Sequence, residues 1–185
     1  DELAQRFVEL MRAYEGAAKA CGSGFDANPS PGNIRDGLIT DAIKSAGAAR
    51  KGGDAPIVDV LDYGEPIRKQ GGLTLYCTPG NDVESTTALA AGGCNLMVFS
   101  TGLGTPTGNP ICQTLKVATS TELATRMADI IDFDAGPIIR GEKSVTEMGI
   151  ELFELALQTA NGTYIPKAVT LGQDDFLPWK RGVSL

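Results

Sequence analysis

Short β-rich runs separated by helical stretches constrain the fold of this chain more than any other feature. Five such runs occur, at residues 57–61, 73–77, 95–100, 115–118 and 130–133. Small-residue or amphipathic stretches typical of helices occur between or after them, at residues 83–91, 121–127 and 144–160. Because a strand, a helix and a further strand at this spacing favour parallel pairing, the sequence predicts an α/β fold, a parallel sheet with flanking helices.

The segment 144–160 is the most regular helix that the sequence predicts. Ser144 and Glu147 have the spacing of a capping box, in which each side chain accepts a hydrogen bond from the backbone of the other residue. Its apolar side chains recur at helical spacing and would form one stripe, made of Val145, Met148, Leu152, Phe153, Leu155 and Ala156. We expect this helix to be scaffold.

Two further helices are predicted before the strands, and a packed tail after them. Apolar residues at helical spacing open the chain, at Leu3, Phe7, Leu10, Met11 and Tyr14. This helix begins without a cap region of its own, so we expect the chain to start within a domain. Residues 39–49 read as a second helix, with Thr40 or Asp41 as its cap. The only tryptophan, Trp179, is expected to pack back on the body.

The composition, with 42% apolar and 21% charged residues, is that of a soluble globular protein. The formal net charge of −7 argues against a nucleic-acid partner, because binding phosphates requires clustered Lys and Arg. No segment is long and apolar enough to span a membrane or to act as a signal peptide, and we expect a cytoplasmic protein.

The four cysteines, Cys21, Cys77, Cys94 and Cys112, lie far apart and form no Cys-x-x-Cys motif. We expect them to be reduced and to fill small buried apolar positions, as free cysteines commonly do. A metal-binding or catalytic role for Cys77 or Cys21 is the alternative.

The absence of histidine restricts the chemistry available to this chain. Histidine is the usual general base, proton shuttle and metal ligand near neutral pH. Chemistry performed by the chain alone would have to use carboxylates, lysine, cysteine or hydroxyls. We therefore expect only part of an active site here.

The first candidate binding segment is residues 28–33. Two prolines, at 29 and 31, remove backbone donors and fix φ, so we expect neither a helix nor a central strand here but a rigid loop. The amides of Asn28 and Asn33 and the hydroxyl of Ser30 suit a polyhydroxylated ligand at little ordering cost. A simple turn is the alternative.

The second candidate segment, residues 78–87, follows a predicted strand and opens a helix. The N–H donors and partial positive charge of a helix N-terminus favour a substrate carboxylate, which would place Asn81 and Asp82 at the ligand. Asp82 and Glu84 could instead bind a metal. Acidic residues are also common in a first helical turn without any function.

The third candidate segment, residues 101–110, follows the 95–100 strand and contains Thr101, Gly102, Gly104 and Thr105. Its spacing departs from the dinucleotide fingerprint and it lacks the P-loop ending, so it predicts a hydroxyl-rich pocket wall and no phosphate site. Lys116, on the next predicted strand, could face this loop as a base or as a partner of a carboxylate. A structural lysine is the alternative.

Several stretches in one order resemble the altronate and galactarate dehydratase family, over nearly the whole chain. They are Asn28-Pro29-Ser30-Pro31-Gly32-Asn33, Val58-Asp59-Val60-Leu61, Thr78-Pro79-Gly80-Asn81-Asp82, Phe99-Ser100-Thr101-Gly102-Leu103-Gly104-Thr105-Pro106, Lys116-Val117-Ala118-Thr119, Ile131-Asp132-Phe133-Asp134-Ala135-Gly136 and Gly182-Val183-Ser184-Leu185. The resemblance implies that residues 1–185 are one unit, the C-terminal part of a larger, modified Rossmann-like catalytic domain.

The resemblance also implies a hydro-lyase that converts a sugar acid into its 2-keto-3-deoxy product with a divalent metal, Fe²⁺ or alternatively Mn²⁺. Most metal ligands would then lie upstream, with Glu84 a possible one here. Lys116 and Asp82 are the expected catalytic residues. The expected substrate contacts are Asn28, Ser30, Asn33, Asn81, Thr101, Gly102, Gly104 and Thr105. The full-length protein is expected to be a homo-oligomer, and the isolated chain to be inactive.

The motif Pro79-Gly80-Asn81-Asp82 and the C-terminal residues favour altronate as the substrate, whereas Gly108-Asn109-Pro110 departs from the common altronate form. Galactarate dehydratase and a sulfo-lyase of the same wider family are alternatives. A non-catalytic module that binds a sugar acid is a hypothesis of another class, supported by the missing histidine and by the lack of a complete metal-ligand set.

Overall fold

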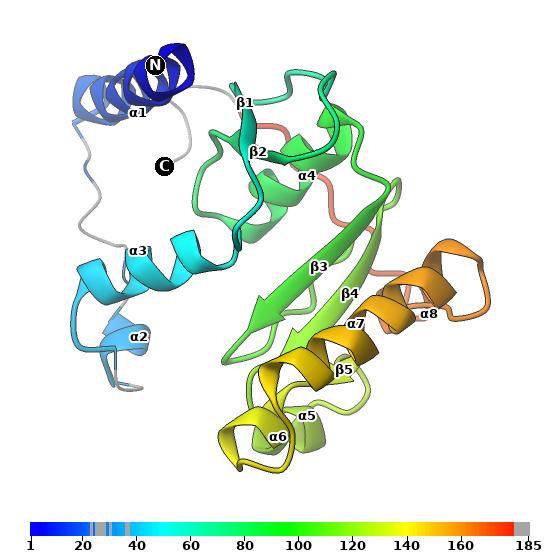
Figure 1. Cartoon of the computed structure of the whole chain (residues 1–185). Coiled ribbons are helices and arrows are strands. Elements are labelled where there is room, and N and C mark those ends of the chain that lie inside the picture. The colour runs from blue at the N-terminus through cyan, green and yellow to red at the C-terminus, as the bar shows by residue number, and fades with distance from the viewer. Residues whose placement is uncertain (23, 25–28, 30, 36–37, 180–185) are drawn as a thin grey trace. The chain divides into compact units, whose positions relative to one another are not determined.

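The computed structural model describes residues 1–22, 24, 29, 31–35 and 38–179. The chain forms two compact units, which are described separately (Figure 1). The described residues of the first lie within 1–92, together with 178 and 179, and the second comprises residues 93–177. In the part of the chain that the structure describes, no helix has the length and apolar character needed to cross a membrane.

The first unit contains four helices and two strands among its described residues. They are α1 (Glu2–Ala20), α2 (Pro31–Arg35), α3 (Asp41–Arg50), β1 (Ile57–Leu61), β2 (Leu73–Tyr76) and α4 (Asp82–Gly92). β1 and β2 pair in parallel, with Val60 opposite Leu75. Thr40 caps α3 through a hydrogen bond from the backbone N–H of Ile43 to Oγ1. The two predicted strands and the helices that flank them are confirmed.

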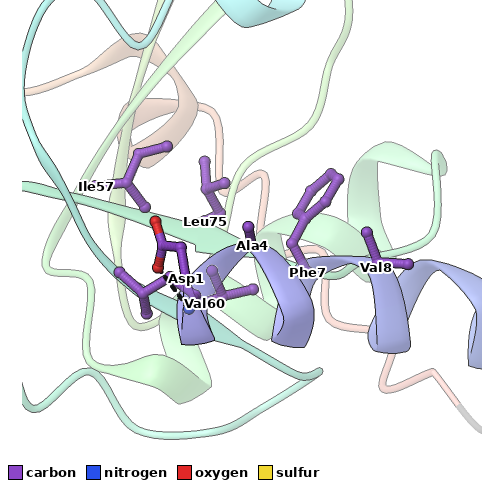
Figure 2. A pocket seen from close by; sticks show the side chains of 8 residues that line it. Asp1, Ala4, Phe7, Val8, Ile57, Val60 and Leu75 are labelled. Atoms are coloured by element: carbon purple, nitrogen blue, oxygen red, sulfur yellow. Dashed lines mark hydrogen bonds between the residues drawn. The ribbon is translucent and has the colours of Figure 1, made fainter.

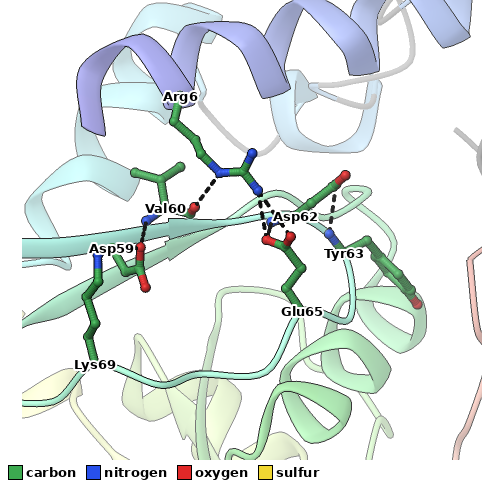
Figure 3. Close-up of polar contacts among 7 residues, drawn as sticks. All are labelled: Arg6, Asp59, Val60, Asp62, Tyr63, Glu65 and Lys69. Atoms are coloured by element: carbon green, nitrogen blue, oxygen red, sulfur yellow. Dashed lines mark hydrogen bonds and ion pairs between the residues drawn. The ribbon is translucent and has the colours of Figure 1, made fainter. Parts of the chain in front are cut away.

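Helix α1 packs on the β1–β2 sheet through an apolar core of Leu10, Val60 and Cys77. A polar contact fixes the same helix at the carboxyl end of β1 (Figure 3). Arg6 donates from Nε to the carbonyl of Val60 at 3.2 Å and from Nη2 to Oε2 of Glu65 at 2.9 Å. This arginine therefore ties α1 to the turn that follows β1.

Two expectations about helix starts were wrong. Asp1 does cap α1, because its carboxylate accepts a hydrogen bond from the backbone N–H of Leu3 at 3.1 Å. Helix α2 begins at Pro31, within the segment predicted to exclude helix. Proline is tolerated in the first turn, where its missing N–H would have no partner in the helix.

The second unit contains a three-stranded parallel sheet and four helices in the part of it that the structure describes. The elements are β3 (Leu96–Thr101), β4 (Gln113–Ala118), α5 (Thr121–Arg126), β5 (Phe133–Asp134), α6 (Gly136–Ile139), α7 (Val145–Ala160) and α8 (Lys167–Thr170). The strand order is β3-β4-β5, with every pairing parallel. The α/β prediction is confirmed, and the parallel strands belong to two sheets, one in each unit.

Helix α7 confirms the predicted capping box of Ser144 and Glu147. Its apolar stripe is narrower than predicted. Met148 is buried, whereas the side chains of Val145 and Phe153 are 70% and 62% exposed. Only the part of the stripe that faces the body of the unit is covered, because a single packed layer hides one side of a helix.

No disulfide joins the cysteines within the described residues, and their burial differs. Cys77 and Cys112 are buried, as expected for apolar filler, and Cys94 is partly buried. Cys21 is exposed at the end of α1, so the filler prediction was wrong for this residue. Burial raises the pKa of the Cys112 thiol to about 11, with a smaller contribution from Cys94.

We predict that alkylation will separate these thiols by rate. The thiolate is the nucleophile, so the exposed Cys21 should react with iodoacetamide at pH 8 at least tenfold faster than Cys112. Peptide mass spectrometry over a time course measures each rate in one sample. Equal rates for Cys21 and Cys112 in the folded chain would contradict the burial described above.

Candidate functional site

The loop after β2 supplies the first candidate site, at the carboxyl edge of the parallel β1–β2 pair. Asn81 caps α4, because its Oδ1 accepts hydrogen bonds from the backbone N–H groups of Val83 at 3.1 Å and Glu84 at 3.3 Å. Thr78 donates its hydroxyl to Ser85 at 3.1 Å, which ties the loop to the first turn of the helix. The side-chain oxygen of Asn81 is therefore used by the helix itself.

The two carboxylates in the first turn of α4 lie in different environments. Asp82 is exposed, whereas Glu84 is 2% exposed. Oε2 of Glu84 is buried without a hydrogen-bond partner among the described residues. An unsatisfied buried acceptor costs about 1–3 kcal/mol, and more when it is charged. Of the two, Glu84 is the carboxylate that retains a shielded, available lone pair.

Aromatic residues surround Glu84. The hydroxyl of Tyr63 donates to the backbone carbonyl of Glu84 at 2.9 Å and accepts a hydrogen bond from the backbone N–H of Trp179 at 2.8 Å. The indole ring of Trp179 makes edge contacts with Tyr14 and Tyr63, at centroid distances of 5.5 and 5.3 Å. The predicted packing of Trp179 is confirmed, since it is 8% exposed.

Burial raises the pKa of the Tyr14 hydroxyl, and the negative charges of Cys77 and Glu84 raise it further. Burial also raises the pKa of Tyr63; the hydrogen bond from Trp179 opposes this effect, and the charge of Glu84 adds to it. Cys77, the first residue after β2, packs with Tyr14. Tyr14, Cys77 and Glu84 therefore lie close to one another, and we call these three residues, together with Tyr63 and Trp179, the Glu84 cluster.

The loop after β3 supplies the second candidate site. Thr101 Oγ1 accepts a hydrogen bond from the N–H of Gly104 at 2.9 Å, and the hydroxyls of Thr105 and Thr107 bond to each other at 2.9 Å. Thr105 and Thr107 are only 6% and 4% exposed. The predicted hydroxyl-rich loop is present, but two of its hydroxyls point inward and satisfy one another. Gly102 is exposed.

Lys116 lies on β4 and is fully buried. Its ammonium group donates to the carbonyl of Pro106 at 3.2 Å and to Oε1 of Gln173, so it faces the 101–110 loop as the sequence suggested. Burial lowers the pKa of Lys116, although the negative charges of Asp132 and Asp175 oppose that shift. In this structure the amine is enclosed by protein acceptors.

Two aspartates that the sequence analysis did not select hold the surroundings of Lys116. Asp132 accepts hydrogen bonds from the backbone N–H of Lys116 at 2.8 Å, the hydroxyl of Tyr164 at 2.8 Å and the backbone N–H of Lys167 at 2.9 Å. Asp175 accepts a hydrogen bond from the N–H of Gly108 at 3.3 Å. Asp132 belongs to one of the motifs that carried the family resemblance, and that motif was the sequence signal that could have identified this residue.

The remaining predicted site residues are distributed as follows. Asn28 and Ser30 lie outside the described residues, and Asn33 is half-buried on α2. Asn81, Asp82 and Glu84 come together in the first unit. Thr101, Gly104, Thr105 and Lys116 come together in the second.

The apolar pocket beside α1 includes none of the predicted site residues (Figure 2). It is lined by Asp1, Leu3, Ala4, Phe7, Val8, Ile57, Val60 and Leu75. The only carboxylate among these residues, Asp1, accepts the capping hydrogen bond of α1. The pocket therefore offers apolar surface and little chemistry.

We predict that Gly104→Ala destabilises the chain by about 1–3 kcal/mol, because Gly104 has a φ of +96° and a Cβ would collide with Met127. Gly102→Ala is the control, since its Cβ would meet only Thr119 Oγ1 at 3.6 Å. Urea unfolding measures both changes. Equal effects of the two substitutions would show that the loop adopts another conformation.

We predict a pH-dependent contribution of Lys116 to stability. Because burial lowers the pKa of Lys116, the folded chain binds this proton less readily than the unfolded chain. The free energy of unfolding should therefore rise, relative to Lys116→Met, from the lowered pKa up to the ordinary lysine value of about 10.4. Urea unfolding of both proteins between pH 7 and 10 tests the sign. A difference that is constant or falls with pH would contradict a desolvated amine.

Comparison with known proteins covers both units. The model of the family "D-galactarate/Altronate dehydratase, C-terminal" matches residues 1–184. The altronate dehydratases of Escherichia coli (strain K12) and Bacillus subtilis (strain 168) are 46% and 42% identical to the chain, over 85% and 100% of its length. The galactarate dehydratase (L-threo-forming) of Escherichia coli (strain K12) is 38% identical over 88% of the chain.

The matched regions make up 31%, 37% and 31% of those three relatives respectively, so the chain spans about a third of their length. The family match, by contrast, covers nearly all of the chain. The chain therefore belongs to the D-galactarate/altronate dehydratase family, as its C-terminal region.

Proposed function

We propose that the chain is the C-terminal part of a hydro-lyase that dehydrates a sugar acid to its 2-keto-3-deoxy product. The observation that carries this proposal is the family match over residues 1–184. Because the chain spans about a third of its relatives, we propose that further segments complete the active site. The lack of histidine agrees with an incomplete set of catalytic groups.

Altronate is the substrate that we favour. The chain is 46% and 42% identical to the two altronate dehydratases and 38% identical to the galactarate dehydratase. Galactarate remains the second candidate, since the two activities share one family.

The 101–110 loop is the proposed wall for the substrate hydroxyls, through Thr101, Gly102, Gly104 and Thr105. Lys116, behind this loop, is the proposed partner of the substrate carboxylate. Since Gln173 and Pro106 accept the hydrogen bonds of its amine here, the substrate would have to take the place of Gln173. Asn28, Ser30, Asn33, Asn81 and Asp82 are further proposed substrate contacts, chosen by their motif positions.

A divalent metal, Fe²⁺ or alternatively Mn²⁺, is the proposed cofactor; when bound, it would acidify the proton on carbon 2 of the substrate. The described residues contain no group of three or more His, Cys, Asp or Glu side chains placed to hold a metal ion. They do not form a metal site by themselves. The ligands would therefore come from elsewhere in the protein.

We also propose a cytoplasmic homo-oligomer, as the sequence analysis suggested. A non-catalytic module that binds a sugar acid is the competing function. In such a module the 101–110 loop would also bind the hydroxyls of the sugar acid. Only turnover separates the two functions.

The deciding experiment assays the full-length protein that carries this chain, anaerobically with Fe²⁺, on altronate, galactarate and sulfolactate. We expect 2-keto-3-deoxy product from altronate, with kcat/KM at least tenfold above that for galactarate. The 185-residue chain alone, at the same concentration, should give no product. Binding without product by the full-length protein would favour the non-catalytic module, and release of sulfite would favour a sulfo-lyase.

A further inference from the structure

We propose that Glu84 is the general base that removes the proton from carbon 2 of the sugar acid. This inference rests on the proposed function and deepens it, because it assigns the proton acceptor of that same reaction. It replaces Asp82, the exposed neighbour, with the buried carboxylate of the same helical turn.

The position of Glu84 is the first argument. Glu84 lies in the first turn of helix α4, which starts at Asp82, six positions after β2 ends at Tyr76. Tyr63 follows the end of β1, so both flank the carboxyl edge of the parallel pair. Parallel α/β sheets bind ligands at this edge, where the loops that follow the strands gather.

The unpartnered oxygen is the second argument. Oε2 of Glu84 is buried and accepts no hydrogen bond from the described residues. Buried polar groups are almost always paired, and an exception calls for an explanation such as a catalytic role. A carboxylate that is shielded from water and has a lone pair available can accept a proton from a substrate bound beside it.

The other candidate bases are engaged elsewhere or are open to water. The amine of Lys116 donates to Pro106 and Gln173, and the carboxylate of Asp132 accepts three hydrogen bonds. Asp82 is exposed. The chain contains no histidine. Among these groups, Glu84 is the one whose oxygen is both buried and unpartnered.

The aromatic residues of the Glu84 cluster give the base a fixed position. Tyr63 holds the backbone carbonyl of Glu84 at 2.9 Å, and Trp179 holds Tyr63 at 2.8 Å. The rings of Tyr14 and Trp179 lie in edge contact, 5.5 Å between centroids. These contacts hold the backbone of Glu84, which limits the rearrangement needed before proton transfer.

In the proposed step, the C–H bond at carbon 2 breaks and its proton bonds to Oε2 of Glu84. The electron pair of that bond forms the double bond between carbons 2 and 3 as the C–O bond at carbon 3 breaks. The departing hydroxide takes up one proton and leaves as water. The enol then becomes the 2-keto product by losing its hydroxyl proton and gaining a proton at carbon 3. Glu84 releases the proton taken from carbon 2, which replaces the one that the hydroxide took up, so the protons balance over one turnover.

The test compares Glu84→Gln with Glu122→Gln in the full-length protein, on the substrate that the wild type turns over best. Glu122 is exposed in the first turn of α5. Glu122→Gln therefore makes the same change in charge as Glu84→Gln, also in the first turn of a helix. We expect Glu84→Gln to lower kcat by about 10²–10⁴-fold with KM changed less than about threefold. Glu122→Gln should keep wild-type kcat. Asp82→Asn should lose less than Glu84→Gln does.

Three readouts distinguish a base from a structural residue. The melting temperature of Glu84→Gln should equal or exceed that of the wild type, because the amide removes an unpaired buried charge. Its bound-metal content should be unchanged. Deuterium at carbon 2 of the substrate should slow the variant more than the wild type, because removal of the proton then limits the rate.

A wild-type kcat in Glu84→Gln would overturn the inference while leaving the proposed function intact. Loss of metal from this variant would overturn it as well, because Glu84 would then be a ligand. If Glu84→Gln does not fold, Glu84→Asp replaces it, with a reduced kcat and a larger isotope effect expected; a wild-type kcat there would refute the role. A wild type that dehydrates no sugar acid would end both proposals.

Discussion

Parallel pairing of short strands is the constraint on which the rest of this structure depends. A parallel strand needs a crossover connection to its neighbour, so the loops that follow the strands gather at one edge. In the first unit, this places Tyr63 and Asn81 at the carboxyl edge of β1 and β2. In the second, it places the 101–110 loop beside Lys116, because β3 and β4 pair with Phe99 opposite Lys116.

Burial then gives similar charged residues different roles. Lys116 is fully buried, but protein acceptors satisfy its amine, and Asp132 and Asp175 lie close enough to favour its charged form. Glu84 is buried to a similar degree, yet one of its oxygens has no partner among the described residues. A satisfied buried charge stabilises one arrangement of the chain, whereas an unsatisfied one is retained at a cost in stability.

Local patterns predicted the elements well. The capping box of Ser144 and Glu147, the cap at Thr40 and the strand at 57–61 follow from neighbouring residues alone, and the structure confirms them. The failures concern what surrounds a residue. Phe153 was assigned to a buried stripe and is 62% exposed, and Cys21 was expected to be buried and is exposed. Helical spacing defines a face, but it does not say how much of that face a neighbour covers.

The sequence by itself determined the α/β class, the order of the strands and helices, and the family, because periodicity, caps and motifs are properties of nearby residues. Only the tertiary structure decided which polar groups are paired. It joined Lys116 to Gln173, 57 positions later, and Tyr63 to Trp179, 116 positions later. Such partners meet through folding, so no local pattern could distinguish the buried Glu84 from the exposed Asp82.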